Sequence, residues 1–298
     1  MSSGRVVVGT SSWADPGFVA EWYPRDLPAA EQLPWYAECF AAVEVNTTYY
    51  GIPAAKTVRR WAEVTPAGFT FDVKLHQALS RHSAPLDTLP KALRDRVETT
   101  PRGRVRPSPK LDRELAERYL KAVDPLVEAG KLSSFLLQLS PAFKPPSKRL
   151  DELDDLLAAL APHPVAVELR HRAWLHDERR AETLAWLEDH GAAFVAVDAP
   201  QGTPPTMMPR LDAVTRPDLA YLRLHGRNAR GWVKGRTVAE RFGYRYDEAE
   251  LEEVAQRAER LAEEADTVRV MFNNNRGDDA PVAAQRLREL LGQGPADR

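Results

Sequence analysis

Acidic and imidazole side chains stand at or near the carboxyl ends of several short apolar runs in this chain. The candidate catalytic residues are Glu44, Glu168, Asp198 and His225. Converging carboxylates can act as an acid and a base when their environments push their pKa values apart. Imidazole titrates near neutral pH, so His225 is the best single candidate for proton transfer. We therefore expect acid-base chemistry of a hydrolase or lyase type.

Amide and cationic residues at similar positions predict an anion-binding pocket. The predicted binding residues are Asn46, Lys74, Gln138, Arg170, Arg223, Asn273 and Asn274, with Trp13, Tyr49 and Trp174 as aromatic walls. Two loops suit a phosphate-bearing ligand, because residues 9–12 and 273–277 are rich in small or amide residues that present backbone N–H groups to an anion. Ordinary turn chemistry explains either loop alone nearly as well.

The same charges permit a purely structural interpretation. Lys74, Arg170 and Arg223 suffice to neutralise the three acids, and buried charges are normally paired. Lys74 would suit a Schiff-base nucleophile if its neighbours desolvated it, but anion binding or pairing with a carboxylate is its simpler role.

A divalent metal is possible in this region, although no cofactor is certain. His76, His82, His171, His176 and His225 fall at expected strand ends or loops, where acids could join them as ligands. No two of these histidines have the i, i+4 spacing of a zincin, and three nearby cations oppose a divalent ion. We therefore assign no metal ligands.

Eight apolar runs of strand length would position these residues. They are Val6–Thr10, Ala42–Asn46, Phe69–Lys74, Phe135–Gln138, Val165–Arg170, Phe194–Asp198, Ala220–His225 and Val268–Asn273. Patterns of helical spacing separate the runs almost without interruption, which is typical of parallel strands. This alternation predicts a (β/α)8 TIM-type barrel, formed as a single domain over residues 1–298.

The alternation of side chains predicts which face of each strand points inward. In residues 43–46, 71–74, 167–170 and 222–225, one face is apolar and the other is polar. A parallel strand covered by a helix must be apolar outward, so the polar face should point into the barrel. The expected inward set is Glu44, Asn46, Asp72, Lys74, Gln138, Glu168, Arg170, Asp198, Arg223 and His225. We expect these groups to form one pocket at the carboxyl ends of the strands.

Two long basic loops follow the third and seventh strands, at residues 76–110 and 226–246. The second interleaves cations with aromatic rings, as in surfaces that stack bases and track phosphates. The candidate nucleic-acid-binding residues are Arg230, Trp232, Lys234, Arg236 and Tyr244. Charged loops that are merely solvated remain the alternative. The sixth crossover, residues 199–217, carries five prolines and should be irregular.

Composition narrows the classes of protein that the chain can represent. The net charge of −2 gives no overall sign of a nucleic-acid-binding protein, so such a role needs a local patch. Cys39 is the one cysteine, which excludes a disulfide framework and a thiolate zinc cluster. The sequence shows neither a charged leader followed by an apolar stretch nor an apolar run of about 18 residues. We expect a soluble cytoplasmic protein without a membrane partner.

Ordered motifs along nearly the whole chain resemble the YecE-like family of TIM-barrel proteins, a family of unknown function. The motifs are residues 9–13 (GTSSW), 22–24 (WYP), 43–50 (VEVNTTYY), 137–141 (LQLSP), 167–170 (VELR), 198–200 (DAP), 221–226 (YLRLHG) and 272–274 (FNN). The resemblance implies a barrel and leaves the reaction open. A histidine often follows the paired asparagines in this family, and here Asn275 stands at that position.

These observations are compatible with three functions. The leading one is an enzyme that performs acid-base chemistry on an anionic, possibly phosphate-bearing substrate in a small-molecule pocket. The second is a nucleic-acid-binding protein or metal-assisted phosphodiesterase that uses the two basic loops. The third is a non-catalytic adaptor, which would not need so many ionisable groups inside a barrel.

Overall fold

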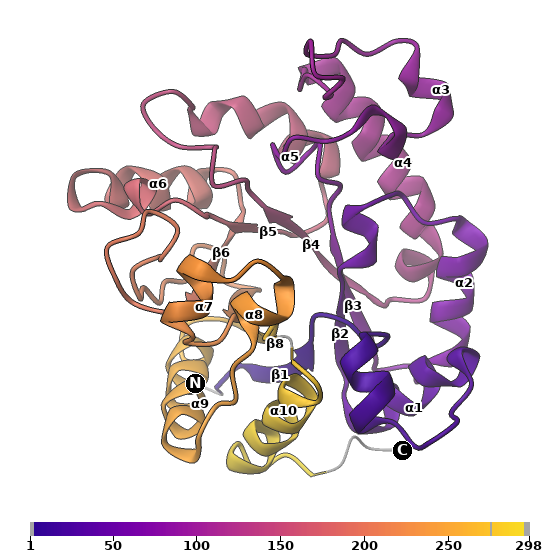
Figure 1. Cartoon of the computed structure of the whole chain (residues 1–298), viewed down its shortest axis with the longest axis vertical. Coiled ribbons are helices and arrows are strands. Elements are labelled where there is room, and N and C mark those ends of the chain that lie inside the picture. Colours follow the sequence, from indigo (N-terminus) through magenta and orange to yellow (C-terminus); the bar gives the residue numbers. More distant parts are fainter. Residues whose placement is uncertain (1–2, 275, 295–298) are drawn as a thin grey trace.

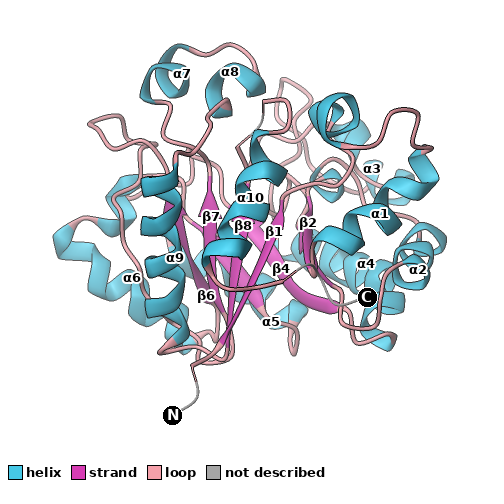
Figure 2. Ribbon diagram, turned by 90° about the horizontal axis from the view of Figure 1, so that it is seen from below, coloured by secondary structure: helices cyan, strands magenta, loops and turns pink. Residues whose placement is uncertain are grey.

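Eight parallel strands close into a barrel within residues 3–274 and 276–294, which this computed structural model describes (Figures 1 and 2). The strands are β1 Arg5–Thr10, β2 Ala42–Val45, β3 Thr70–Lys74, β4 Leu132–Gln138, β5 Val165–Glu168, β6 Ala193–Asp198, β7 Ala220–Leu224 and β8 Thr267–Phe272. Each strand pairs with the next along the chain, and β8 closes the barrel by pairing with β1. The predicted TIM-type barrel is confirmed.

Helices surround the barrel, and α7 and α8 lie above the carboxyl ends of the strands (Figure 2). The helices are α1 Gln32–Cys39, α2 Ala55–Val64, α3 Lys91–Arg94, α4 Pro109–Glu128, α5 Asp154–Leu160, α6 Asp177–Asp189, α7 Ala229–Lys234, α8 Val238–Phe242, α9 Glu248–Ala262 and α10 Asp279–Leu290.

Local sequence explains where the long outer helices begin. The Ser108 side chain accepts a hydrogen bond from the Leu111 backbone N–H, and Pro109 occupies the first turn of α4, where its missing N–H costs nothing. Asp247 and Glu250 form a reciprocal capping box at the start of α9. Both helices then bury one apolar stripe against the barrel, as amphipathic helices do.

The crossovers and loops follow the predicted pattern. No helix or strand is present within 199–219, between β6 and β7, in this part of the described chain, which fits its prolines. The insertion after β3 carries α3 and two isolated bridges, and the insertion after β7 carries α7 and α8. Both insertions leave strands at their carboxyl ends, so they build the face on which a barrel places its active site.

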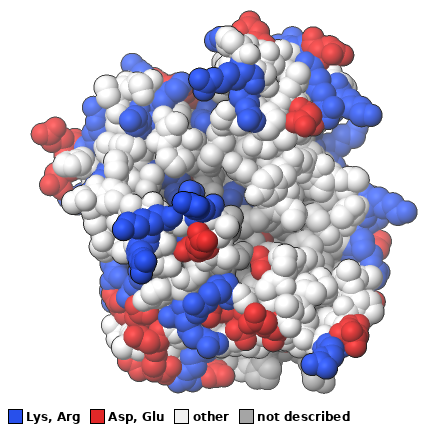
Figure 3. Space-filling view, viewed as in Figure 1, with Lys and Arg blue, Asp and Glu red and all other residues white. Residues whose placement is uncertain are grey.

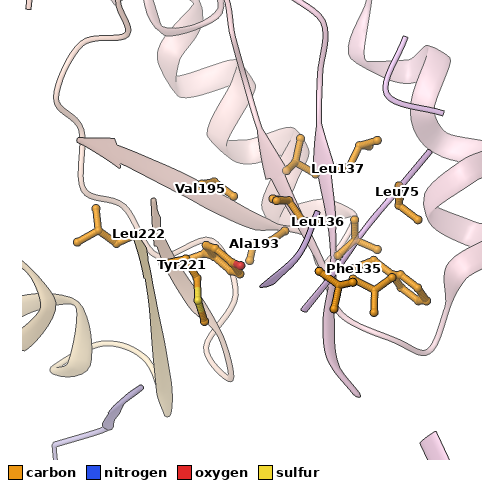
Figure 4. Close-up of a cluster of buried hydrophobic side chains, with 14 of the residues drawn as sticks. Leu75, Phe135, Leu136, Leu137, Ala193, Val195, Tyr221 and Leu222 are labelled. Carbon is orange, nitrogen blue, oxygen red and sulfur yellow. The ribbon is translucent and has the colours of Figure 1, made fainter. Parts of the chain in front are cut away.

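The interior of the barrel contains both apolar side chains and buried charges. Leu136, Ala193 and Tyr221 lie close together in the apolar part (Figure 4). Next to Tyr221 in register, Arg269 of β8 donates to Asp72 of β3 in a buried ion pair. Polar groups therefore extend deeper into this barrel than its upper layer alone.

Candidate anion-binding pocket

A buried ion-pair bridge crosses the upper part of the barrel. Arg223 of β7 lies between Glu44 of β2 and Glu168 of β5, and all three side chains are fully buried. Arg223 Nε and Nη2 donate to the two oxygens of Glu44 at 2.9 and 2.6 Å, and Nη1 donates to Glu168. Burial alone would lower the pKa of Arg223, but the attraction of Glu44 and Glu168 outweighs it and raises that pKa.

Glu168 is surrounded by hydrogen-bond donors. Gln138 Nε2 lies 3.0 Å from both carboxylate oxygens, Arg170 Nη1 lies 3.3 Å from Oε1, and His225 Nε2 lies 3.0 Å from Oε1. Burial raises the pKa of this carboxyl group, but Arg223 and His225 outweigh burial and hold the pKa well below its usual range. Glu168 is therefore ionised, and both of its carboxylate oxygens accept hydrogen bonds.

His225 is neutral, and both of its ring nitrogens are occupied. Asn273 Nδ2 lies 2.9 Å from His225 Nδ1, and Asn273 Oδ1 accepts hydrogen bonds from Arg223 and Asn46. This fixes the Asn273 amide as a donor to Nδ1, so His225 Nε2–H donates to Glu168. Burial lowers the pKa of His225 to about 4 despite the nearby carboxylate. The imidazole thus belongs to the buried network.

Lys74 differs from the cations around it. Its Nζ makes no hydrogen bond or ion pair with any residue of the described chain, and it lies 4.9 Å from the centroid of the Tyr49 ring. Burial and the neighbouring Arg223 lower the pKa of Lys74 to about 7, although Glu44 and Glu168 partly oppose them. An amine with this pKa is partly neutral at physiological pH.

A pocket of about 380 Å³ opens beside Lys74 at the carboxyl ends of the strands. Figure 3 shows this face hollowed near its middle, with Lys and Arg side chains at the edge of the hollow. The lining includes Ser11, Asp15, Asn46, Tyr49, Tyr50, Lys74, Gln138, Arg170, Phe242, Asn273 and Asn274. The structure thus brings many of the predicted binding residues together.

Three buried atoms of the pocket wall lack a partner among the described residues: Ser11 Oγ, Asn46 Oδ1 and Asn274 Oδ1. Buried polar atoms are normally hydrogen-bonded, and an exception calls for an explanation. The two amide oxygens accept hydrogen bonds only and have almost no solvent-accessible surface, so they suit hydroxyl or amino groups of a ligand only after their side chains turn toward the pocket.

The charged groups in and below the pocket differ in whether they have a direct partner. Glu44 and Glu168 carry two negative charges, and Arg223 and Arg170 contact them with two positive charges. Lys74 is an additional cation when protonated, and Asp15 supplies a carboxylate elsewhere in the lining. The arrangement around Lys74 therefore favours an anion.

Removing this amine should stabilise the fold. The pKa of Lys74 is about 7 in the folded protein and about 10.4 in an unfolded chain, so the unfolded chain binds more protons between those values. Burying the protonated Lys74 amine thus lowers the stability of wild type most below pH 7, and this destabilisation disappears as the pH rises toward 10. We expect Lys74→Met to raise the free energy of unfolding by about 1 kcal/mol at pH 6.5 and by less at pH 9.

Denaturant unfolding at both pH values measures this difference, with Lys234→Met as the control because Lys234 is exposed on α7. Equal stabilities of Lys74→Met and wild type at pH 6.5 would contradict the lowered pKa.

The prediction that Asp198 shares this pocket is wrong. Val197 pairs with Arg223 and faces the interior, so Asp198 at the next position faces the helices. Asp198 accepts hydrogen bonds from Arg227 at 2.9 and 2.8 Å, Arg257 of α9 at 2.9 Å and Tyr246 at 3.0 Å. Burial would raise its pKa, but the arginines and Tyr246 hold that pKa below its usual range. The residue anchors the loop after β7 to α9.

Two predicted aromatic walls lie elsewhere. Trp174 is buried, stacks on Phe143 and donates its Nε1–H to the Phe143 carbonyl at 2.8 Å. Trp13 packs edge-on against Trp61, 5.4 Å between ring centroids. The described lining includes neither tryptophan, so these two predictions are wrong, whereas Tyr49 lines the pocket as expected.

The second basic loop lines the pocket through Phe242, and its other aromatic rings pack within the protein. The Trp232 ring packs against His225 and Phe242, lies 5.4 Å from the Arg170 guanidinium, and its Nε1 donates to Thr206. The hydroxyl of Tyr244 donates to Glu250. These rings are not free to stack on bases. Arg230, Lys234 and Arg236 remain exposed, and their contact with nucleic acid stays a prediction.

Several cations of the first basic loop form ion pairs or hydrogen bonds within the protein. Arg81 pairs with the buried Asp112 of α4, and Arg96 pairs with Glu114 of the same helix. Arg94 donates to the backbone carbonyls of Leu89 and Asp87.

The sequence interpretation missed two interior residues, Arg269 and Tyr221. Arg269 pairs with Asp72, and the Tyr221 hydroxyl donates to Glu44 at 3.0 Å. The alternation in β8 could have predicted that Arg269 faces inward, because Arg269, Met271 and Asn273 occupy one face of that strand.

Three further observations concern metal binding, membrane crossing and the phosphate loop. Among residues 3–274 and 276–294, no three His, Cys, Asp or Glu side chains are grouped to hold a metal ion. No helix in the same ranges combines the length and apolar character needed to cross a membrane. Asn275, which carries part of the predicted phosphate loop, lies outside the described residues.

Comparison with known sequences finds relatives along nearly the whole chain. A family model described as a protein of unknown function, DUF72, matches residues 7–298. The chain is 27% identical over 293 residues to the UPF0759 protein YunF of Bacillus subtilis, covering 96% of this chain and 94% of YunF. It is 34% identical over 201 residues to the UPF0759 protein YecE of Escherichia coli K12, covering 65% of this chain and 59% of YecE.

Two crystal structures of DUF72 proteins are similar in fold. The protein from Enterococcus faecalis V583 has a TM-score of 0.76 at 26% identity, covering 98% of this chain and 99% of that one. The protein from Thermotoga maritima MSB8 has a TM-score of 0.77 at 28% identity, covering 97% of this chain and all (100%) of that one.

Proposed function

The chain belongs to the DUF72 family, as its resemblance to YecE-like proteins predicts, and we propose that it is an enzyme whose pocket binds a small anionic substrate through Lys74 and Arg170. The observation that carries this proposal is the amine of Lys74, which faces the pocket without a carboxylate partner among the described residues. A bound anion would supply the direct partner that this amine lacks.

The surrounding contacts support a hydroxylated ligand. Arg170 lines the same pocket and uses one guanidinium nitrogen on Glu168, which leaves other N–H groups for an anion. Asn46 Oδ1 and Asn274 Oδ1 would accept from hydroxyl groups of the substrate once their side chains turn toward the pocket. A phosphate or carboxylate attached to a hydroxylated carbon chain meets both requirements.

The contacts also suggest how proton transfer is divided. Glu44 and Glu168 are both paired with Arg223, which favours the structural alternative for these two acids over proton exchange. An amine with a pKa of about 7 is the best-poised proton carrier in the pocket at neutral pH. Lys74 therefore takes the proton-transfer role that the sequence analysis gave to Glu44, Glu168 and His225.

Titration calorimetry with glycerol 3-phosphate tests the proposal. We expect saturable binding to wild type and about 10- to 100-fold weaker binding to Lys74→Met, because a hydrogen bond to a charged group contributes about 1.5 to 3 kcal/mol. The control Lys234→Met should bind like wild type, since Lys234 is exposed and outside the pocket lining. Equal affinities of Lys74→Met and wild type, or no binding at all, would overturn the proposal.

A single-stranded oligonucleotide in the same assay tests the nucleic-acid alternative. Binding that weakens steeply with salt and disappears on replacing Arg230, Lys234 and Arg236 with alanine would favour that alternative. We expect no such binding, because the interleaved rings of Trp232 and Tyr244 are engaged within the protein.

A further inference from the structure

The position of Lys74 suits covalent chemistry, and we propose that its Nζ forms an imine with the carbonyl carbon of a hydroxylated, anionic aldehyde or ketone. This inference rests on the proposed anion-binding function and adds the substrate class and the bond that forms. The pocket beside Lys74 has a volume of about 380 Å³, which accommodates a small ligand of this kind.

An amine becomes a nucleophile only when its lone pair is free. In the described chain, the two nearest carboxylates already accept hydrogen bonds from Arg223, and no acid lies within ion-pair distance of Lys74 Nζ. The nitrogen instead lies over the Tyr49 ring, 4.9 Å from its centroid. No side chain of the described pocket competes with an incoming carbonyl group for this nitrogen.

The charges around Lys74 come from several elements. Arg223 of β7 and Arg170 beyond β5 oppose protonation of the amine, whereas Glu44 of β2 and Glu168 of β5 favour it. His82, in the loop after β3, is electrostatically coupled to Lys74 and has its own pKa lowered to about 4 by burial, so it is neutral. The net pKa of about 7 for Lys74 supplies free amine at neutral pH.

The rest of the pocket is suited to orient such a substrate. Arg170 would hold the anionic group while the carbonyl carbon meets Lys74. The unpartnered oxygens of Asn46 and Asn274 are buried and would accept from the substrate hydroxyls after these side chains turn toward the pocket, and Ser11 Oγ would donate or accept after the same kind of rotation. A substrate bound at three such points presents one carbon to the amine.

The reaction balances without a further reactant. The Nζ lone pair attacks the carbonyl carbon, a C–N bond forms, and the oxygen leaves as water together with the two amine hydrogens. A proton from solvent converts the imine to an iminium ion. This cation withdraws electrons from the neighbouring carbon and makes its C–H or C–C bond easier to break, which matches the lyase type of chemistry expected from the sequence.

Reductive trapping tests the proposal. Dihydroxyacetone phosphate, an anionic hydroxylated ketone, is incubated with the full chain and sodium borohydride, and the product is analysed by intact mass and peptide mapping. We expect one reduced adduct per chain, located on Lys74, with a yield that rises between pH 6 and pH 8. Lys74→Arg should keep much of the affinity for glycerol 3-phosphate, because it retains the charge, but should form no adduct.

Glycerol 3-phosphate has no carbonyl group, so its binding separates the two proposals. Binding of glycerol 3-phosphate at Lys74 without an adduct from dihydroxyacetone phosphate would overturn the imine and leave the anion site standing. An adduct that persists in Lys74→Arg would also overturn it, because the reaction would then belong to other lysines. Failure of both phosphate compounds to bind would overturn the imine together with the proposed function.

Discussion

Replacing Glu168 with glutamine should lower the free energy of unfolding by about 3 to 5 kcal/mol, the cost of breaking a buried ion pair. The carboxylate accepts hydrogen bonds from Gln138, Arg170, Arg223 and His225, all of which are donors. A glutamine amide would turn its own NH₂ group toward some of these donors. Arg223 would also lose one of its two balancing charges inside the barrel.

Thermal unfolding of Glu168→Gln measures this cost, and a fall of roughly 5 to 15 °C in Tm is expected for a domain of this size. Glu117→Gln on the exposed face of α4 is the matched control and should change Tm by less than about 1 °C. If Glu168→Gln is as stable as wild type, the carboxylate does not stabilise the fold, which is the result expected for a catalytic acid or base.

Replacing Asp198 with asparagine should have a comparable effect by a different route. Asp198 accepts hydrogen bonds from Arg227, Arg257 and Tyr246, so the change removes the buried carboxylate that the two arginines share and leaves them with partners at the edge of the cluster such as Glu253 and Asp212. Arg227 lies at the start of the 226–246 loop, which contacts His225 through Trp232 and lines the pocket through Phe242. We expect a loss of about 3 kcal/mol and a loosening of this loop.

Hydrogen exchange separates loosening of the loop from general destabilisation. Peptides from α7 and α8 should exchange at least several-fold faster in Asp198→Asn, whereas peptides from the distant α4 should change little under native conditions. Asp124→Asn, on an exposed position of α4, is the control. Unchanged exchange in α7 and α8 would contradict the anchoring role of Asp198.

The alternation of residue types explains which parts of the site could be predicted from the sequence. In β2, β3, β5 and β7 the polar positions alternate with apolar ones, so the inward face was evident, and Glu44, Lys74, Glu168 and Arg223 all face the barrel interior. Of these four, Lys74 lines the pocket as expected, whereas the three ion-paired residues are fully buried and do not line it. In β6 both faces are apolar until its last residue, so the alternation there gave no basis for placing Asp198.

Other features depend on three-dimensional contacts that residue types do not specify. The sequence contains enough acids to neutralise each cation, and only the geometry of Arg223 leaves Lys74 without a carboxylate in the described chain. An aromatic residue near a strand end fits a pocket wall and a buried core equally well. Trp174 belongs to the core because its indole N–H is satisfied by the Phe143 carbonyl.

A crystal structure of the wild-type protein with glycerol 3-phosphate, determined near pH 7, tests the central claim most directly. The account predicts phosphate oxygens within hydrogen-bond distance of Lys74 Nζ and the Arg170 guanidinium, with ligand hydroxyl groups donating to Asn46 or Asn274. Glu44 and Glu168 should keep their contacts with Arg223. A structure in which Lys74 instead pairs with Glu44 or Glu168, and the phosphate binds elsewhere, would contradict the account.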